Sequence, residues 1–235
     1  MKKLYFLLVL VFINLIGYGQ VSSYTFSSSS GTYTALSGGT ALIPPYSGIT
    51  GNGWFEQCYN VPLPFVYYFN GKGYSSTYIN SNGYLTFGAP GAVGNGRPYT
   101  TNNGQSGTIM GYACGTQYGY SGGAGTIALG GLIDNSNANP ITYGTIGSAP
   151  NRIFVVQWTS CYRSVSYYSS NAGVAESLTF QIRLKETSNV AELVYNSSTS
   201  NYTGTFYPTP GLSGTSTADF NLCSGSTWSS VTNNK

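Results

Sequence analysis

The chain has 235 residues, of which only 6% are charged, and it contains 32 Gly, 22 Tyr, 4 Cys and no His. Soluble domains usually carry about 25% charged residues, so a helical protein rich in Lys and Glu is excluded, as are histidine-dependent catalysis and histidine-bound metal. The formal net charge of +3 includes two lysines in the first three residues, and the remaining charge is too small for a nucleic-acid partner.

Residues 1–19 are predicted to form a signal peptide. The two lysines precede an apolar run over residues 4–16, which is too short to span a bilayer comfortably and is followed by small residues. Cleavage after Gly19 would leave Gln20 as the first residue. Because no other apolar run reaches about 18 residues, we expect a mature chain that is not embedded in a membrane and is secreted or held at the outer cell surface.

The first predicted strands form a meander. Asn70 is followed by Gly71 and Asn82 by Gly83, and an Asn-Gly pair is the strongest short signal for a hairpin turn. Apolar and aromatic residues between these turns favour strands. We expect strands at residues 65–69, 74–79 and 84–87.

A long loop is predicted next, over residues 89–125. It is rich in Gly, Asn, Ser and Tyr and exceeds the usual length of a connection within a compact domain. A simple linker would not be expected to carry Tyr112, Tyr118 and Tyr120, so we interpret the segment as an excursion stapled by a disulfide through Cys114.

The strongest strand pattern lies at residues 177–185, where apolar and polar side chains alternate. Residues 190–195 are predicted to return as its hairpin partner. Residues 153–158 are almost continuously apolar, which is typical of a central strand covered on both faces, and residues 141–146 are expected to pair with it.

This pattern predicts an all-β fold. No segment after residue 19 has helical periodicity over more than about ten residues, and many short strands at regular spacing favour an antiparallel β-sandwich of the jelly-roll or immunoglobulin-like type. Residues 20–235 are expected to form one domain, with its core at about residues 24–228.

Four motifs carry a resemblance to a known family: YINSNGYLTFG at residues 78–88, APNRIFVVQW at 149–158, LTFQIRLKETSNVAELVY at 178–195 and PTPGLSGTSTADFNLCSGSTW at 208–228. In this order they resemble the N-terminal β-sandwich region of large secreted and cell-surface proteins of Bacteroidota. Such proteins commonly continue into fibronectin type III modules and a type IX secretion sorting domain. The segment at 178–195 also resembles, more loosely, the nidogen-type extracellular domain.

The resemblance implies a fold and a surface location, and its motifs carry no catalytic residues. No fibronectin-type module or sorting domain follows the last motif within the sequence. We therefore expect either a stand-alone secreted domain or the front part of a longer surface protein.

Export would place the cysteines in an oxidising compartment, where disulfides persist. Their spacing contains no close pair and no His is present, so disulfides are favoured over a zinc site. All three pairings stay open. A second tyrosine-bearing loop is predicted at residues 162–172, and a bond between Cys114 and Cys161 would bring it beside the loop at residues 89–125. The predicted disulfide residues are Cys58, Cys114, Cys161 and Cys223.

Catalysis and cofactor binding are not expected. Glu186 and Glu192 are interpreted as a solvated turn residue and an outward-facing strand residue, and Asp134 and Asp219 as turn formers that bind the local backbone. No pair of carboxylates is therefore indicated for glycoside hydrolysis, and a Ser or Cys nucleophile would lack a His base. Asp134 with its neighbouring Asn residues offers too few carboxylates for calcium.

Tyrosines are the remaining candidates for function, because Tyr beside Ser, Gly and Asn is typical of binding loops. Tyr also suits the outer face of a sheet, so a purely structural role stays open for each of them. The candidate binding residues are Tyr112, Tyr118, Tyr120, Tyr162, Tyr167, Tyr168, Arg97 and Arg163.

These residues predict a non-catalytic surface or adhesion module that presents tyrosine-rich loops to a glycan or an extracellular protein. Two alternatives stay open. One is a carbohydrate-binding accessory domain, in which Tyr rings stack on sugar. The other is a self-associating structural protein, since a chain with so few charges has little electrostatic repulsion between copies.

Overall fold

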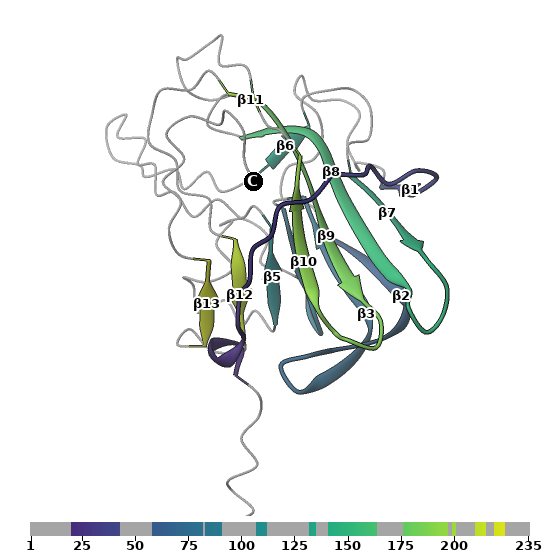
Figure 1. Cartoon of the computed structure of the whole chain (residues 1–235), viewed down its shortest axis with the longest axis vertical. Coiled ribbons are helices and arrows are strands. Elements are labelled where there is room, and N and C mark those ends of the chain that lie inside the picture. The colour runs from purple at the N-terminus through teal and green to yellow at the C-terminus, as the bar shows by residue number, and fades with distance from the viewer. Residues whose placement is uncertain are drawn as a thin grey trace, which may run out of the picture.

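The computed structural model describes residues 20–42, 58–81, 83–90, 107–111, 132–134, 141–163, 176–196, 199–200, 210–214 and 219–223. These residues form two antiparallel β-sheets with a shared core, preceded by one 3-10 helix, η1 (Val21–Ser23) (Figure 1). The predicted all-β sandwich is therefore confirmed.

The first sheet has seven strands in the order β1-β7-β8-β9-β10, with β6 also paired to β8 and β11 also paired to β9. Its strands are β1 (Thr40–Ala41), β6 (Leu132–Asp134), β7 (Ile141–Ile146), β8 (Ile153–Arg163), β9 (Glu176–Lys185), β10 (Ala191–Tyr195) and β11 (Thr199–Ser200).

The second sheet has six strands in the order β13-β12-β5-β4-β3-β2. Its strands are β2 (Cys58–Phe69), β3 (Lys72–Asn80), β4 (Tyr84–Thr86), β5 (Thr108–Met110), β12 (Gly211–Ser213) and β13 (Phe220–Leu222).

Most predicted strands are present, although β2 begins at Cys58, seven residues before the predicted start at residue 65. β7, β9 and β10 agree with the predicted segments to within one residue at each end. β8 continues to Arg163, beyond the predicted end at residue 158, because a bulge lies between Trp158 and Cys161. Ser160 has a φ of 50° there, and its N–H donates a hydrogen bond of 3.0 Å to the Thr179 hydroxyl, which keeps the strand attached to β9.

The predicted hairpin at Asn70 and Gly71 is confirmed. These residues have φ angles of 50° and 74°, and two positive values are what a type I′ turn requires. The turn joins β2 to β3, and Phe69 pairs with Lys72 directly beside it.

Aromatic side chains fill the core between the sheets. Trp158 and Phe180, both almost fully buried, lie on neighbouring strands with ring centroids 4.9 Å apart and planes 5° apart. Phe87 supports the other sheet, where its ring lies 5.2 Å from Phe69 and 5.6 Å from Tyr67. This stacking explains why the alternating apolar positions of β2, β8 and β9 are buried.

The predicted long loop at residues 89–125 is wrong in one respect, because β5 interrupts it. β5 lies in the middle of the six-stranded sheet, between β4 and β12, and Thr108, Ile109 and Met110 are all buried. Three residues are too few to show an alternating pattern, so tertiary packing rather than local sequence defines this strand.

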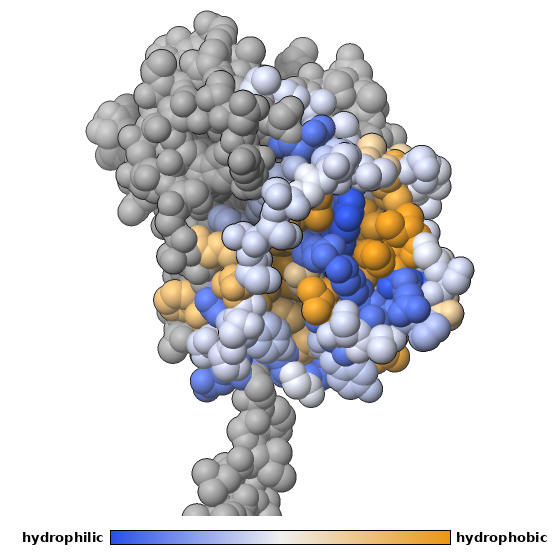
Figure 2. Space-filling view, in the orientation of Figure 1, coloured by the Kyte–Doolittle hydropathy of each residue, from blue (hydrophilic) through white to orange (hydrophobic). Residues whose placement is uncertain are grey.

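An extended segment, the N-terminal strap (residues 33–42), crosses the outer face of the seven-stranded sheet (Figures 1 and 2). Two buried amides hold it. Gln157 accepts a hydrogen bond of 2.8 Å from the Leu36 N–H, and Gln181 donates one of 2.9 Å to the Thr34 carbonyl. The strap thus covers the outer face of β8 and β9, as the apolar run at residues 153–158 predicts.

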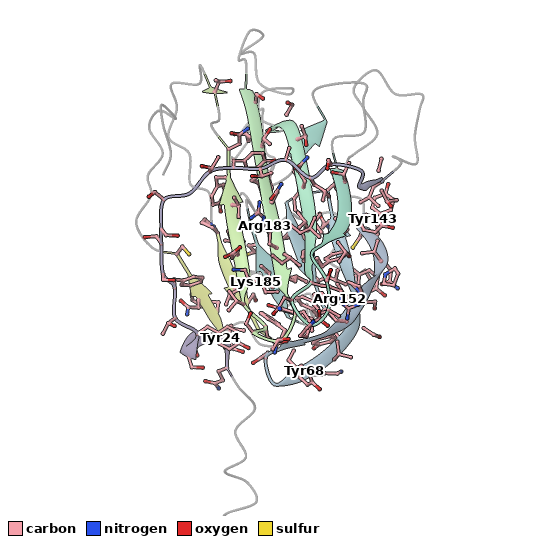
Figure 3. All side chains as sticks on the ribbon, turned by 45° about the vertical axis from the view of Figure 1, so that its right-hand side comes forward. Tyr24, Tyr68, Tyr143, Arg152, Arg183 and Lys185 are labelled. Carbon is pink, nitrogen blue, oxygen red and sulfur yellow. The ribbon has the colours of Figure 1, made fainter. Side chains whose placement is uncertain are left out.

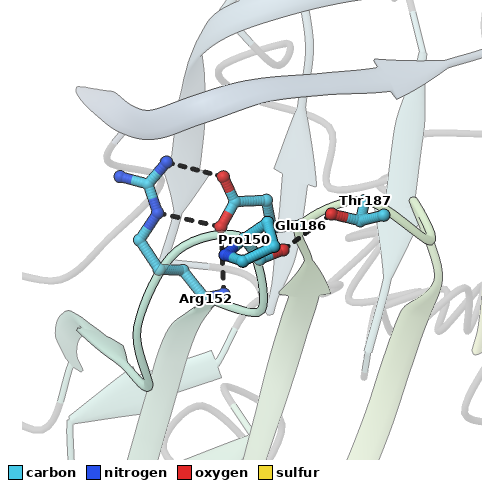
Figure 4. Close-up of polar contacts among 4 residues, drawn as sticks. All are labelled: Pro150, Arg152, Glu186 and Thr187. Carbon is cyan, nitrogen blue, oxygen red and sulfur yellow. Dashed lines mark hydrogen bonds and ion pairs between the residues drawn. The ribbon is translucent and has the colours of Figure 1, made fainter.

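An ion pair joins two turns at one end of the sandwich (Figure 4). Arg152 donates to Glu186 from Nε at 2.9 Å and from Nη2 at 2.6 Å, and the Thr187 hydroxyl donates to the Pro150 carbonyl at 2.6 Å. The Arg152 guanidinium also lies 5.6 Å from the centre of the Phe65 ring on the other sheet. Glu186 lies in the turn between β9 and β10, as predicted, but its side chain is only 14% exposed and is bound by Arg152, so the prediction that it is solvated is wrong.

Candidate functional site

The strands of both sheets finish at two opposite ends of the sandwich. At one end, which we call the turn end, short turns at residues 70–71, 147–152 and 186–190 join neighbouring strands. At the opposite end, which we call the loop end, β5, β8 and β10 finish. The Tyr195 hydroxyl at the end of β10 donates a hydrogen bond of 2.6 Å to the Gly111 carbonyl after β5, so the two sheets are tied together at the loop end.

Both segments predicted to carry binding tyrosines start or finish at the loop end. Residues 112–131 connect Gly111 to β6, and residues 164–175 connect β8 to β9. Leu132, where the first segment rejoins the sheet, pairs directly with Arg163, from which the second segment leaves. Neighbouring antiparallel strands lie about 4.8 Å apart, so the two segments share an attachment point.

The attachment at Gly111 is tightly packed. A Cβ at this position would lie 2.8 Å from Phe180 Cε2 and 3.1 Å from Ile182 Cγ1, so only glycine fits without movement. The Gly111 N–H donates to the Gly83 carbonyl at 3.0 Å. Burial raises the pKa of the Tyr195 hydroxyl, which favours its protonated, hydrogen-bond-donating form. The first tyrosine segment thus leaves from a fixed point.

Arg97 belongs to a different connection. Residues 91–106 lead from β4 to β5, and Phe87 N–H donates to the Gly107 carbonyl at 2.9 Å where they leave and return. A Cβ on Gly107 would lie 3.1 Å from Phe69, beside the hairpin at the turn end. The structure therefore attaches the segment of Arg97 at the end opposite to the other candidates, and Arg97 does not share their attachment point.

Most of the predicted side chains lie outside the described residues. The backbones of Tyr162 and Arg163 are the last two residues of β8, at the loop end. Their participation in binding, like that of the others, stays a prediction. The candidates outside the described residues are Arg97, Tyr112, Tyr118, Tyr120, Tyr167 and Tyr168.

The described cysteines do not support the predicted pair of disulfides. No disulfide joins any two of Cys58, Cys161 and Cys223, although two bonds among four cysteines would need one of these. Cys58 and Cys223 lie at opposite edges of the six-stranded sheet, about 24 Å apart at about 4.8 Å per strand, whereas a disulfide needs Cα atoms within about 7 Å. Cys161 packs in the core. Cys114, with its predicted bond to Cys161, lies outside the described residues.

The described carboxylates have structural surroundings. Glu192 forms an ion pair with Lys185 (labelled in Figure 3) on the outer face of β9 and β10, which agrees with its predicted outward orientation. Asp219 is buried and accepts hydrogen bonds from the Ser22 N–H at 3.3 Å and from Asn70 Nδ2 at 3.4 Å, so interpreting it as a local turn former is wrong. The backbone of Asp134 lies in β6 and not in a loop.

Two features are absent from the part of the chain that the structure describes. Within it, no group of three metal-ligating side chains occurs. Among the same residues, no helix has the length and apolar character needed to cross a bilayer.

Sequence reasoning missed the residues that anchor the loop end. Tyr195 reads as the last residue of an apolar strand, and nothing in the sequence links it to Gly111, 84 positions earlier. The pairing of Leu132 with Arg163 is equally invisible, because β6 has only three residues. A glycine directly after a short apolar run is the one signal that could have marked Gly111.

Comparison with known proteins identifies one family. A family model described as NIDO related matches residues 23–235. No curated protein and no solved structure matches the chain. The matched range includes every strand described above and both tyrosine segments, so the description applies to the sandwich as a whole.

Proposed function

Because the chain belongs to the NIDO-related family, we propose that it is an extracellular, non-catalytic module that binds a glycan or a protein through tyrosine-rich segments at its loop end. The pairing of Leu132 with Arg163 carries this proposal, since it gives both segments one attachment point. Binding residues are commonly placed on loops that a rigid scaffold positions, and the aromatic core supplies that rigidity.

The composition of the two segments favours a neutral ligand. Residues 112–131 and 164–175 contain five tyrosines and no charged residue. A tyrosine ring offers a flat apolar face for stacking and a hydroxyl for hydrogen bonding, which together suit the faces and hydroxyl groups of a sugar. A neutral polysaccharide is therefore the preferred ligand, and an uncharged protein surface is the second candidate.

The module is proposed to act outside the cell. The family match and the predicted signal peptide support an extracellular position, and the resemblance to N-terminal domains of Bacteroidota surface proteins supports secretion or display at the outer cell surface. A surface position would give such a module access to environmental polysaccharides or to neighbouring cells.

A glycan array tests the proposal with the secreted full-length chain and a matched control. Combined substitution Tyr112→Ala, Tyr118→Ala and Tyr120→Ala should weaken binding to the best glycan by about tenfold or more, since aromatic anchors dominate interface energy. Tyr68→Ala removes a tyrosine that is 57% exposed at the turn end and should leave binding unchanged. Loss of binding in Tyr68→Ala with retention in the triple variant would contradict the assignment. Selective binding to a protein and to no glycan would favour the second candidate.

A further inference from the structure

The first residues of the described chain form a separate docking element, which we call the N-terminal arm (Gln20–Tyr24). Val21 is fully buried and belongs to the hydrophobic core. The Tyr24 ring lies edge-on to Phe69 at 5.9 Å, and its hydroxyl accepts a hydrogen bond of 2.8 Å from the Asn70 N–H. The arm thus contributes a core side chain and an aromatic contact although it forms no β-strand.

The surface that receives the arm, which we call the socket, is built from the β2–β3 hairpin and from β13. Asn221 Nδ2 donates to the Val21 carbonyl at 3.2 Å, and the Asp219 carboxylate accepts from the Ser22 N–H at 3.3 Å. A Cβ on Gly214 would lie 1.8 Å from Asp219 Oδ2, so glycine is required for this carboxylate to reach the arm. The socket therefore binds backbone groups of the arm through these two hydrogen bonds, while the Val21 side chain is buried.

A plain linker separates the arm from the next fixed point of the chain. Residues 25–32 have the sequence TFSSSSGT, and all of them are exposed. They contain no turn or bend, and nothing lies within 4 Å of a Cβ placed on Gly31. After the linker, the Tyr33 hydroxyl donates to Gln157 at 2.9 Å and fixes the beginning of the strap. Serine-rich linkers behave as flexible chains, so the arm is joined to the domain by an element that can be redirected.

From these contacts we propose that the socket also accepts the N-terminal arm of a second copy of this chain, so that two copies exchange arms. Every contact of the arm would be the same in the exchanged state, because the arm and the socket are identical in both copies. The exchanged and unexchanged states therefore differ only in the path of the linker, and the exchanged state is favoured by a higher concentration of the chain. The low charge of the chain, 6% of residues, leaves little repulsion against this approach.

Shortening the linker tests the exchange. An extended chain spans about 3.3 Å per residue, so deletion of the four serines at residues 27–30 removes about 13 Å of reach. The arm of the shortened chain should no longer reach its own socket and should occupy that of a second copy. Light scattering after size-exclusion chromatography should then give twice the monomer mass. A monomer at all concentrations would overturn the proposal.

Two controls separate arm exchange from other association. Val21→Asp in the shortened chain places a charge in the buried site and should restore the monomer, and an excess of the peptide QVSSYTF should also dissociate the dimer. A dimer that survives either treatment would overturn the proposal. If the shortened chain does not fold, two differently tagged copies of the unshortened chain can be refolded together. Mutual capture that Val21→Asp abolishes would support exchange, and no capture would refute it.

Discussion

The carboxylate of Glu186 accepts two hydrogen bonds from the guanidinium of Arg152, one of 2.9 Å from Nε and one of 2.6 Å from Nη2. This pair joins the β7–β8 turn to the β9–β10 turn. These hydrogen bonds lower the pKa of Glu186 from 4.5 to about 2. A carboxylate with a depressed pKa stabilises the folded state above its unfolded pKa, and this contribution is lost as the pH falls through the folded pKa.

The first prediction follows from this pair. Thermal unfolding of the native chain should show a midpoint that declines as the pH is lowered from about 4.5 to about 2, with Glu186 contributing part of the decline. Glu186→Gln should lower the midpoint at pH 7 and flatten the profile in this window. Arg152→Gln removes the same interaction and should flatten it similarly. An unchanged profile in both variants would contradict the role assigned to the pair.

The second prediction concerns the aromatic core. Phe180 is 1% exposed and stacked on Trp158, so Phe180→Ala should reduce the free energy of unfolding by about 3–5 kcal/mol. Arg183, on the opposite face of β9, donates to Gln181 at 2.7 Å and to the Thr34 carbonyl at 3.4 Å, so Arg183→Ala should cost only about 1 kcal/mol. Denaturant titration measures both. Equal losses would mean that the faces of β9 are assigned incorrectly.

The third prediction concerns the anchor of the loop end. Tyr195→Phe removes the hydroxyl that binds the Gly111 carbonyl and should cost about 1 kcal/mol of stability. Hydrogen exchange at the amides next to Gly111 should become faster, because the carbonyl that fixes the segment is released. Tyr68→Phe, at an exposed position of the turn end, is the matched control and should leave exchange at Gly111 unaltered.

The fourth prediction concerns the edge of the six-stranded sheet. In the described residues β2 pairs only with β3, and it contains Pro62 and Pro64, which have no N–H to donate to another strand. Combined Pro62→Thr and Pro64→Thr should therefore promote association that increases with concentration, as measured by light scattering. Ser76→Thr, on the paired strand β3, should not. A double variant that stays monomeric would show that other features protect this edge.

The sequence predicted those parts of the fold that depend on a few neighbouring residues. The alternation at residues 177–185 and the Asn70-Gly71 turn each depend on a few neighbouring residues, and the structure has both. β5 and the N-terminal strap could not be predicted. The strap has no periodicity, and its place depends on Gln157 and Gln181, whose amides lie more than 120 positions away.

The residue types of the candidate site could be predicted from the sequence, but its place in the fold could not. Tyrosines among Ser, Gly and Asn indicate binding segments, whereas the shared attachment of two segments depends on Leu132 pairing with Arg163. For the same reason, the sequence could not show that the segment of Arg97 is attached apart from the other candidates, since nothing in it indicates that β5 divides the predicted loop.

The N-terminal arm docks at the turn end, beside the Asn70 hairpin, whereas both tyrosine segments are attached at the loop end. Two copies that exchanged arms would meet through their turn ends and keep both loop ends accessible. Such a pair would be divalent, and on a repetitive polysaccharide its second contact would form at a high effective concentration. Avidity would then let individually weak sugar contacts hold the protein firmly on a polymer surface while each contact remained readily reversible.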